Sequence, residues 1–208
     1  MSDMSIEMMK IADVALNLLI FVITGVIVVR FFRKEGKWAP ERGRFAFRFF
    51  TTQSNVLCAC GALLTAAFLL SGDVPRWAWT LKYVGTAAVT VTMLTVLFFL
   101  WPVIGKEGPK VLLTGSDLFL HLINPLLAIA SFCFFEKRGM SFLWSLWGMV
   151  PVLVYGQHYL YRIVCAPEGK RWDDYYRFNQ QGKWPLAFFL MVLGTFLICM
   201  GFLAAQNA

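Results

Sequence analysis

The sequence predicts an all-α integral membrane protein, a single domain over residues 1–208 built as a bundle of six transmembrane helices. Apolar residues make up 59% of the chain and charged residues only 15%, against roughly 45–50% and about 25% in soluble proteins. The apolar residues fall into six blocks of about 20 residues, the length that crosses a bilayer as a helix. Tryptophans mark the ends of these blocks, where amphipathic rings prefer to lie: Trp38, Trp77, Trp79, Trp101, Trp172 and Trp184.

The first block, Ile11–Val29, runs directly into Arg30 with no small-residue cleavage site before it. It is therefore expected to be a retained helix and not a removed signal peptide. Because backbone amides must be paired in lipid, the other blocks are expected to be helical too. They are Phe50–Leu70, Tyr83–Pro102, Asp117–Phe135, Phe142–Val164 and Pro185–Ala205, separated by turn-rich connections such as GKEGPK and APEGKRWDD.

The distribution of lysine and arginine predicts the orientation of the bundle. The connections after the first, third and fifth blocks carry 14 of these residues, whereas the opposite side carries five, counting Lys10 and Lys82. The positive-inside rule then places loops one, three and five in the cytoplasm and both termini outside. This distribution also accounts for the net charge of +7, so no nucleic-acid partner is expected. The five cysteines match no zinc pattern and are expected to be small packing residues.

Polar residues within apolar spans are costly unless they are paired or face a cavity, so they mark candidate sites. At ~1.5 Å per helical residue, those of the second, fourth and fifth spans lie close to one hydrocarbon boundary, on the basic side. Together they predict a polar pocket that opens toward the cytoplasm. The residues are Thr51, Thr52, Gln53, Ser54, Asn55, Asp117, His121, Asn124, Gln157 and His158.

Asp117, His121 and Asn124 share one helix face by their spacing of four and three residues. A carboxylate beside an imidazole can fix its tautomer and raise its basicity, as a general base requires. A threonine hydroxyl becomes a nucleophile when such a base takes its proton. Pro125 frees a backbone carbonyl near residue 121, which can bend the helix and widen a cavity. Simpler roles stay open: threonines cap helix starts, and histidine or amide side chains join neighbouring helices.

The fifth connection, KRWDDYYRFNQQGKWP, mixes basic and aromatic residues. Such a mixture favours an anchor at the lipid headgroups, and covering a site is the alternative.

Two segments carry a family resemblance. Phe49-Phe50-Thr51-Thr52-Gln53-Ser54-Asn55 resembles the FT-x-QSN signature of a bacterial family of six-span membrane proteins, and Asp117–Pro125 resembles that family's histidine helix. The bacterial family is similar to the androgen-induced-gene family of multipass membrane hydrolases, which cleave fatty-acid esters of hydroxy fatty acids with a threonine and a histidine. The resemblance places Thr51 as the nucleophile and His121 as the base, with Thr52 one residue away as the alternative. Asn124 departs from the apolar residue expected before the proline.

The resulting hypothesis is an intramembrane hydrolase of a lipid-like ester in a bacterial inner membrane. Asp117 would orient His121, and Gln53, Ser54, Asn55 and Gln157 are candidate donors to the developing oxyanion. No metal or cofactor is required. Two rivals remain: a haem protein with His121 and His158 as axial ligands, and a transporter or binding scaffold whose polar residues line a pathway.

Overall fold

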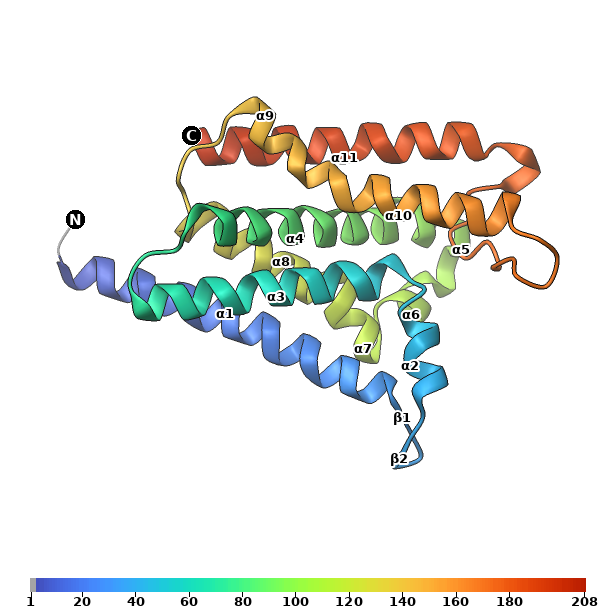
Figure 1. The fold of residues 1–208 in the computed structure, drawn as a ribbon, viewed down its shortest axis with the longest axis horizontal. Coiled ribbons are helices and arrows are strands. Elements are labelled where there is room, and N and C mark those ends of the chain that lie inside the picture. The colour runs from blue at the N-terminus through green and yellow to red at the C-terminus, as the bar shows by residue number, and fades with distance from the viewer. Residues whose placement is uncertain (1–2) are drawn as a thin grey trace.

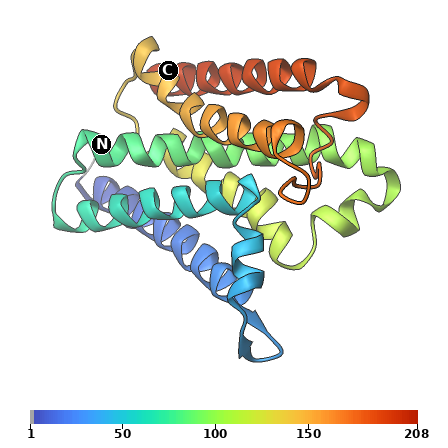
Figure 2. The same cartoon turned by 45° about the vertical axis from the view of Figure 1, so that its right-hand side comes forward.

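The computed structural model describes residues 3–208, which are helical except for one short hairpin and the connecting loops. The long helices run lengthwise beside one another, with the two termini near one end of the bundle and the hairpin projecting from the other (Figure 1). Turning the view shows the chain from α5 to α7 looping out beyond the end of the bundle (Figure 2).

The first half of the chain contributes three long helices. α1 (Asp3–Phe31) leads into the hairpin of β1 (Arg33–Lys34) and β2 (Lys37–Trp38), which is followed by α2 (Pro40–Ala46). α3 (Phe50–Ser71) then packs against both α1 and α4 (Arg76–Thr95). The chain beyond α4 stays helical through η1 (Val96–Leu100, a π-helical turn), α5 (Trp101–Ile104), η2 (Gly105–Glu107, 3-10) and α6 (Gly108–Leu112).

The second half is more irregular. The helix that carries His121 comprises α7 (Gly115–Leu118), the π-helical turn η3 (Phe119–Ile123), α8 (Asn124–Ala130) and the π-helical turn η4 (Ser131–Phe135). The next comprises α9 (Phe142–Ser145), η5 (Leu146–Met149, 3-10), α10 (Val150–Leu160) and η6 (Tyr161–Cys165, π). After a loop with the 3-10 turn η7 (Gln180–Gly182), α11 (Trp184–Asn207) completes the bundle.

The prediction of a multispan helical membrane protein is confirmed, but the count of six spans is not. Five helices among residues 3–208 are long and apolar enough to cross a bilayer: Met4–Phe31, Phe50–Ser71, Arg76–Leu112, Gly115–Phe135 and Trp184–Asn207. The predicted span Phe142–Val164 is helical, but 3-10 and π turns divide it, so it does not form one uniform α-helix.

Apolar side chains cover the outer face of the bundle, as expected for contact with lipid. Leu19, Val22 and Val26 are exposed on α1, and Leu186 and Leu197 are exposed on α11. A soluble protein rarely leaves so large an apolar surface exposed.

Small residues allow a close contact between α3 and α4. A Cβ on Gly61 would lie 2.8 Å from Lys82 Cα, and one on Gly85 would lie 2.6 Å from Cys58 Cα. Close backbone approach through small residues is typical of membrane helix pairs. An aromatic core then joins α4 to η4 and α11 through Trp79, Tyr83, Phe132 and Phe202.

Two boundary predictions were wrong in an informative way. The third span begins at Arg76, seven residues before the predicted Tyr83, so Lys82 lies inside α4 and is fully buried instead of belonging to a loop. The predicted turn GKEGPK is part of the helical chain from η2 to α6. The glycine and lysine residues of this segment are typical of a turn, and they do not indicate the packing that stabilises these short helices.

Candidate active site

Thr51 and His121, 70 residues apart in sequence, meet at one end of the bundle. Thr51 lies in the first turn of α3, after Phe49 in an extended conformation, and His121 lies in the π-helical turn η3. The Oγ1 atom of Thr51 is 3.5 Å from Nε2 of His121. Hydroxyl–imidazole contacts of this kind are often long in the absence of substrate and shorten when it binds.

A backbone carbonyl sets the tautomer of His121. The Nδ1 atom lies 2.7 Å from the carbonyl oxygen of Leu112. Since a carbonyl can only accept, Nδ1 must carry the hydrogen. In the neutral ring, Nε2 then holds the lone pair, and it faces the Thr51 hydroxyl. The imidazole is thus oriented as a general base for that hydroxyl.

Leu112 is the last residue of α6, two residues beyond the GKEGPK segment that was expected to be a turn. Asp117, which was expected to orient His121, is near enough to interact with it electrostatically. The hydrogen bond of the Nδ1–H group, however, goes to Leu112. No sequence signal distinguishes one backbone carbonyl from its neighbours, so this partner was not predicted.

The two adjacent threonines, Thr51 and Thr52, have different surroundings. Thr52 is only 4% exposed, so its side chain is buried inside the bundle. Thr51 contacts His121 and lines a cavity of about 320 Å³. Of the two hydroxyls, only that of Thr51 therefore combines a base with an adjoining space for a substrate.

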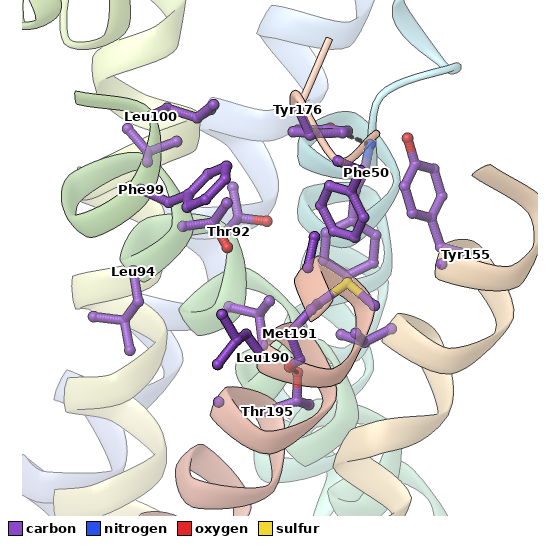
Figure 3. A pocket seen from close by; sticks show the side chains of 18 of the residues that line it. Phe50, Thr92, Leu94, Phe99, Leu100, Tyr155, Tyr176, Leu190, Met191 and Thr195 are labelled. Carbon is purple, nitrogen blue, oxygen red and sulfur yellow. Dashed lines mark hydrogen bonds between the residues drawn. The ribbon is translucent and has the colours of Figure 1, made fainter. Parts of the chain in front are cut away.

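The cavity beside Thr51 is almost wholly apolar. It lies between α3, α4 with η1, α10 and α11, and Figure 3 shows Phe50, Phe99, Tyr155, Leu190 and Met191 around it. Thr92 and Thr195 add two hydroxyl groups to the wall. A volume of this size and apolar character suits a hydrocarbon chain.

The same cavity reaches the lipid-facing surface. Among its lining residues, Phe98 of η1 is 75% exposed and Leu190 of α11 is 53% exposed. Such exposed apolar side chains place an edge of the cavity on the side of the bundle, between η1 and α11. A ligand dissolved in the bilayer could enter there without crossing water.

The loop between η6 and α11 covers the cavity and adds a phenol next to Thr51. The hydroxyl of Tyr176 accepts a hydrogen bond from the Phe50 amide at 3.0 Å (Figure 3). Tyr176 and Phe178 both line the cavity. Asp174 fixes this loop by accepting hydrogen bonds from the Tyr159 hydroxyl and the amides of Phe178 and Asn179. This loop therefore covers one side of the cavity.

Tyr176 was not among the site residues predicted from the sequence. Burial raises its pKa, although the Phe50 amide and the hydroxyls of Tyr155 and Thr51 oppose the shift. The phenol therefore stays neutral, and its own hydrogen is available for donation toward Thr51 or a bound ligand. Its only advance signal was its position in the aromatic connection before the last span.

The polar side chains of Ser54, Asn55 and Asn124 hold neighbouring helices together around Thr51. Asn55 donates to the carbonyls of Thr51 (2.9 Å) and Leu120 (3.0 Å), which ties α3 to the residue before His121. Asn124 donates to Asn55 Oδ1 and to Thr24 Oγ1, both at 3.0 Å, which joins α8 to α3 and α1. Ser54 is hydrogen-bonded to the Thr51 carbonyl and to Thr92. These contacts explain why a buried amide precedes Pro125.

The remaining predicted residues lie elsewhere. Gln53 donates to the carbonyl of Phe47, and Gln157 is exposed. His158 lines a second cavity, between α3 and α10, and its ring meets the Trp172 ring edge to face with the ring centroids 5.3 Å apart. His121 instead faces Thr51, so the two histidines do not turn toward one another across a shared space.

No group of three or more histidine, cysteine, aspartate or glutamate side chains within residues 3–208 is arranged to hold a metal ion. No family model, curated protein or solved structure matches the chain.

Proposed function

We propose that the protein hydrolyses a lipid-like ester, of the type formed between a fatty acid and a hydroxy fatty acid, from within the bilayer. The observation that carries the proposal is the Thr51–His121 contact, in which a tautomer set by Leu112 presents a free lone pair to a hydroxyl. The apolar cavity beside Thr51 and its edge at the lipid-facing surface suit an acyl chain. The family resemblance of the segments around Thr51 and His121 favours the same chemistry.

In the first half of the reaction, Thr51 Oγ1 attacks the ester carbonyl carbon while His121 Nε2 takes the hydroxyl proton. The carbonyl oxygen becomes an oxyanion, and the neutral phenol of Tyr176, which interacts with Thr51, is a donor available to stabilise it. The bond from carbon to the alcohol oxygen breaks, and the leaving alcohol takes the proton from His121. The acyl group stays on Thr51.

In the second half, water attacks the acyl-threonine carbonyl carbon, and His121 takes a proton from this water. The ester bond to Thr51 then breaks, Thr51 recovers its proton from His121, and the fatty acid leaves. The apolar walls of the cavity hold the acyl chain through both steps.

We propose that the bundle around this site crosses the membrane six times. In addition to the five long helices, the contiguous helical segment from Phe142 to Cys165, which lies alongside α11, forms a span (Figure 1). The excess of basic residues places loops one, three and five in the cytoplasm and both termini outside. The resemblance favours a bacterial inner membrane.

Turnover of a long-chain ester by protein in lipid nanodiscs tests the proposal. His121→Asn keeps an amide NH for the Leu112 carbonyl but removes Nε2, so it should fold and lose at least about 100-fold in rate. Thr51→Ala should lose hydrolysis as well, whereas Thr52→Ala should keep it. Undiminished hydrolysis by folded His121→Asn protein would show that this site is not the catalyst.

A further inference from the structure

A second polar cluster lies inside the bundle, away from Thr51. Of the charged side chains described for residues 4–208, only Asp13, Lys82 and Glu136 are buried, at 3%, 0% and 7% exposure. They come from α1, from α4 and from the residue that follows η4. Lys82 packs against Gly61, midway along α3, so the cluster is enclosed by the bundle.

Asn17 and Ser131 join the three charged groups. Lys82 Nζ donates to Asn17 Oδ1 at 2.5 Å and to Ser131 Oγ at 3.2 Å, and it lies 3.5 Å from Glu136 Oε1. The ammonium group is therefore hydrogen-bonded to Asn17 and Ser131 and ion-paired with Glu136.

The Ser131 hydroxyl lies between the two acids, 2.8 Å from Asp13 Oδ1 and 2.5 Å from Glu136 Oε1. A hydroxyl has one hydrogen, so it can donate to only one of them at a time. The amide of Asn17 also approaches Asp13 Oδ1 at 2.9 Å and Glu136 Oε1 at 3.2 Å. The other Glu136 oxygen, Oε2, is buried without a hydrogen-bond partner in the described residues.

The charges of this cluster do not balance. Two ionised carboxylates facing one ammonium leave one negative charge, and a net charge in an apolar interior is strongly disfavoured. The thiols of Cys58 on α3 and Cys133 in η4 also interact with the cluster, and they carry no charge when protonated. Lys137, which follows Glu136 and interacts with Cys133, is exposed, so its charge lies outside the buried cluster.

We propose that Asp13, Glu136 and Lys82 form a proton-binding site that holds one proton, shared between the two carboxyl groups. The orphaned Glu136 oxygen favours this assignment, because a neutral carboxyl loses far less than a carboxylate when one of its oxygens is left unpaired. The ammonium of Lys82 already fills the cation position among Asn17, Ser131 and Glu136, which favours a proton over a metal ion as the ligand.

Infrared spectroscopy of the purified protein in nanodiscs tests the charge balance directly. A protonated carboxyl gives a C=O stretching band separate from the amide bands, and this band shifts in D₂O. At neutral pH the natural protein should show one such band. Asp13→Asn and Glu136→Gln should each abolish it, because one carboxylate is then balanced by Lys82. The control Glu107→Gln removes an exposed acid paired with Lys110 and should leave the band unchanged.

Removing the ammonium should have the opposite effect. Lys82→Met leaves two carboxyl groups without a counter-charge, so the band should double. If Lys82→Met does not fold, the proposal is tested by Asp13→Asn and Glu136→Gln alone, because these substitutions hardly change the shape of the side chain. No band in the natural protein, or a band that survives both amide substitutions, would overturn the proposal. A band that appears only when sodium is withdrawn would identify a sodium site and would overturn it as well.

Discussion

Thr51 and Thr52 are identical side chains on consecutive residues, and their different surroundings follow from the direction in which α3 turns them. Thr51 faces His121 and the cavity, whereas the Thr52 side chain is buried inside the bundle. A single sequence defines the residue types but not which of two neighbours faces a base. The same limit applies to Tyr176, which approaches Thr51 only because the loop before α11 folds back over the cavity.

Tyr176→Phe tests the proposed oxyanion donor. Removing one preorganised donor typically lowers the rate by about 10²–10³-fold. Because burial raises the pKa of Tyr176, its phenol stays protonated from mildly acidic to mildly alkaline pH. The ratio of natural to variant rates should therefore be constant over this range. A merely structural role would instead lower the melting temperature and leave the rate of the folded protein intact.

At the scale of the elements, irregular helical turns position the site. His121 lies in a π-helical turn just before Asn124 and Pro125, and the carbonyl of Leu120 in that turn accepts a hydrogen bond from Asn55. π-helical turns inside helices often mark functional sites. Pro125 predicted a disturbed helix near residue 121. The Leu120 carbonyl is paired with the side chain of Asn55 on α3. Hydropathy patterns carry no information about such a partner.

Gly85→Ala tests the close contact between α3 and α4. The added Cβ would lie 2.6 Å from Cys58 Cα, so the two backbones must separate. We expect the free energy of unfolding in detergent to fall by about 1–3 kcal/mol, as for overpacked cores. Gly25→Ala is the matched control, since a Cβ there meets nothing within 4 Å. Equal stability of both variants would contradict the close packing of these helices.

At the scale of the whole molecule, apolar blocks predicted much of the architecture. Phe50–Leu70 and Pro185–Ala205 agree with α3 and α11 to within about two residues at each end. The convergence of polar residues also predicted the meeting of Thr51 and His121, although Gln157 and His158 lie elsewhere. The buried cluster of Asp13, Lys82 and Glu136 was missed, because each residue lies near an end of an apolar block and resembled a solvated flank.

The position of the cavity predicts a preference for long acyl chains. Gly194 of α11 lines the cavity, and a Cβ there meets nothing within 4 Å. Gly194→Phe should fill this space and slow hydrolysis of long-chain esters much more than that of acetyl esters. Gly201→Phe, two turns further along α11, adds the same bulk outside the cavity. An equal loss for both ester lengths would argue against an acyl chain in this cavity.

The central claim is that His121 activates Thr51. The most direct test is labelling of the purified protein with a fluorophosphonate probe, followed by mass spectrometry of the modified peptide. If His121 activates Thr51, a phosphonate adduct forms on Thr51 that is lost in Thr51→Ala and His121→Asn but persists in Thr52→Ala. An adduct on Thr52, or no adduct on correctly folded natural protein, would contradict it.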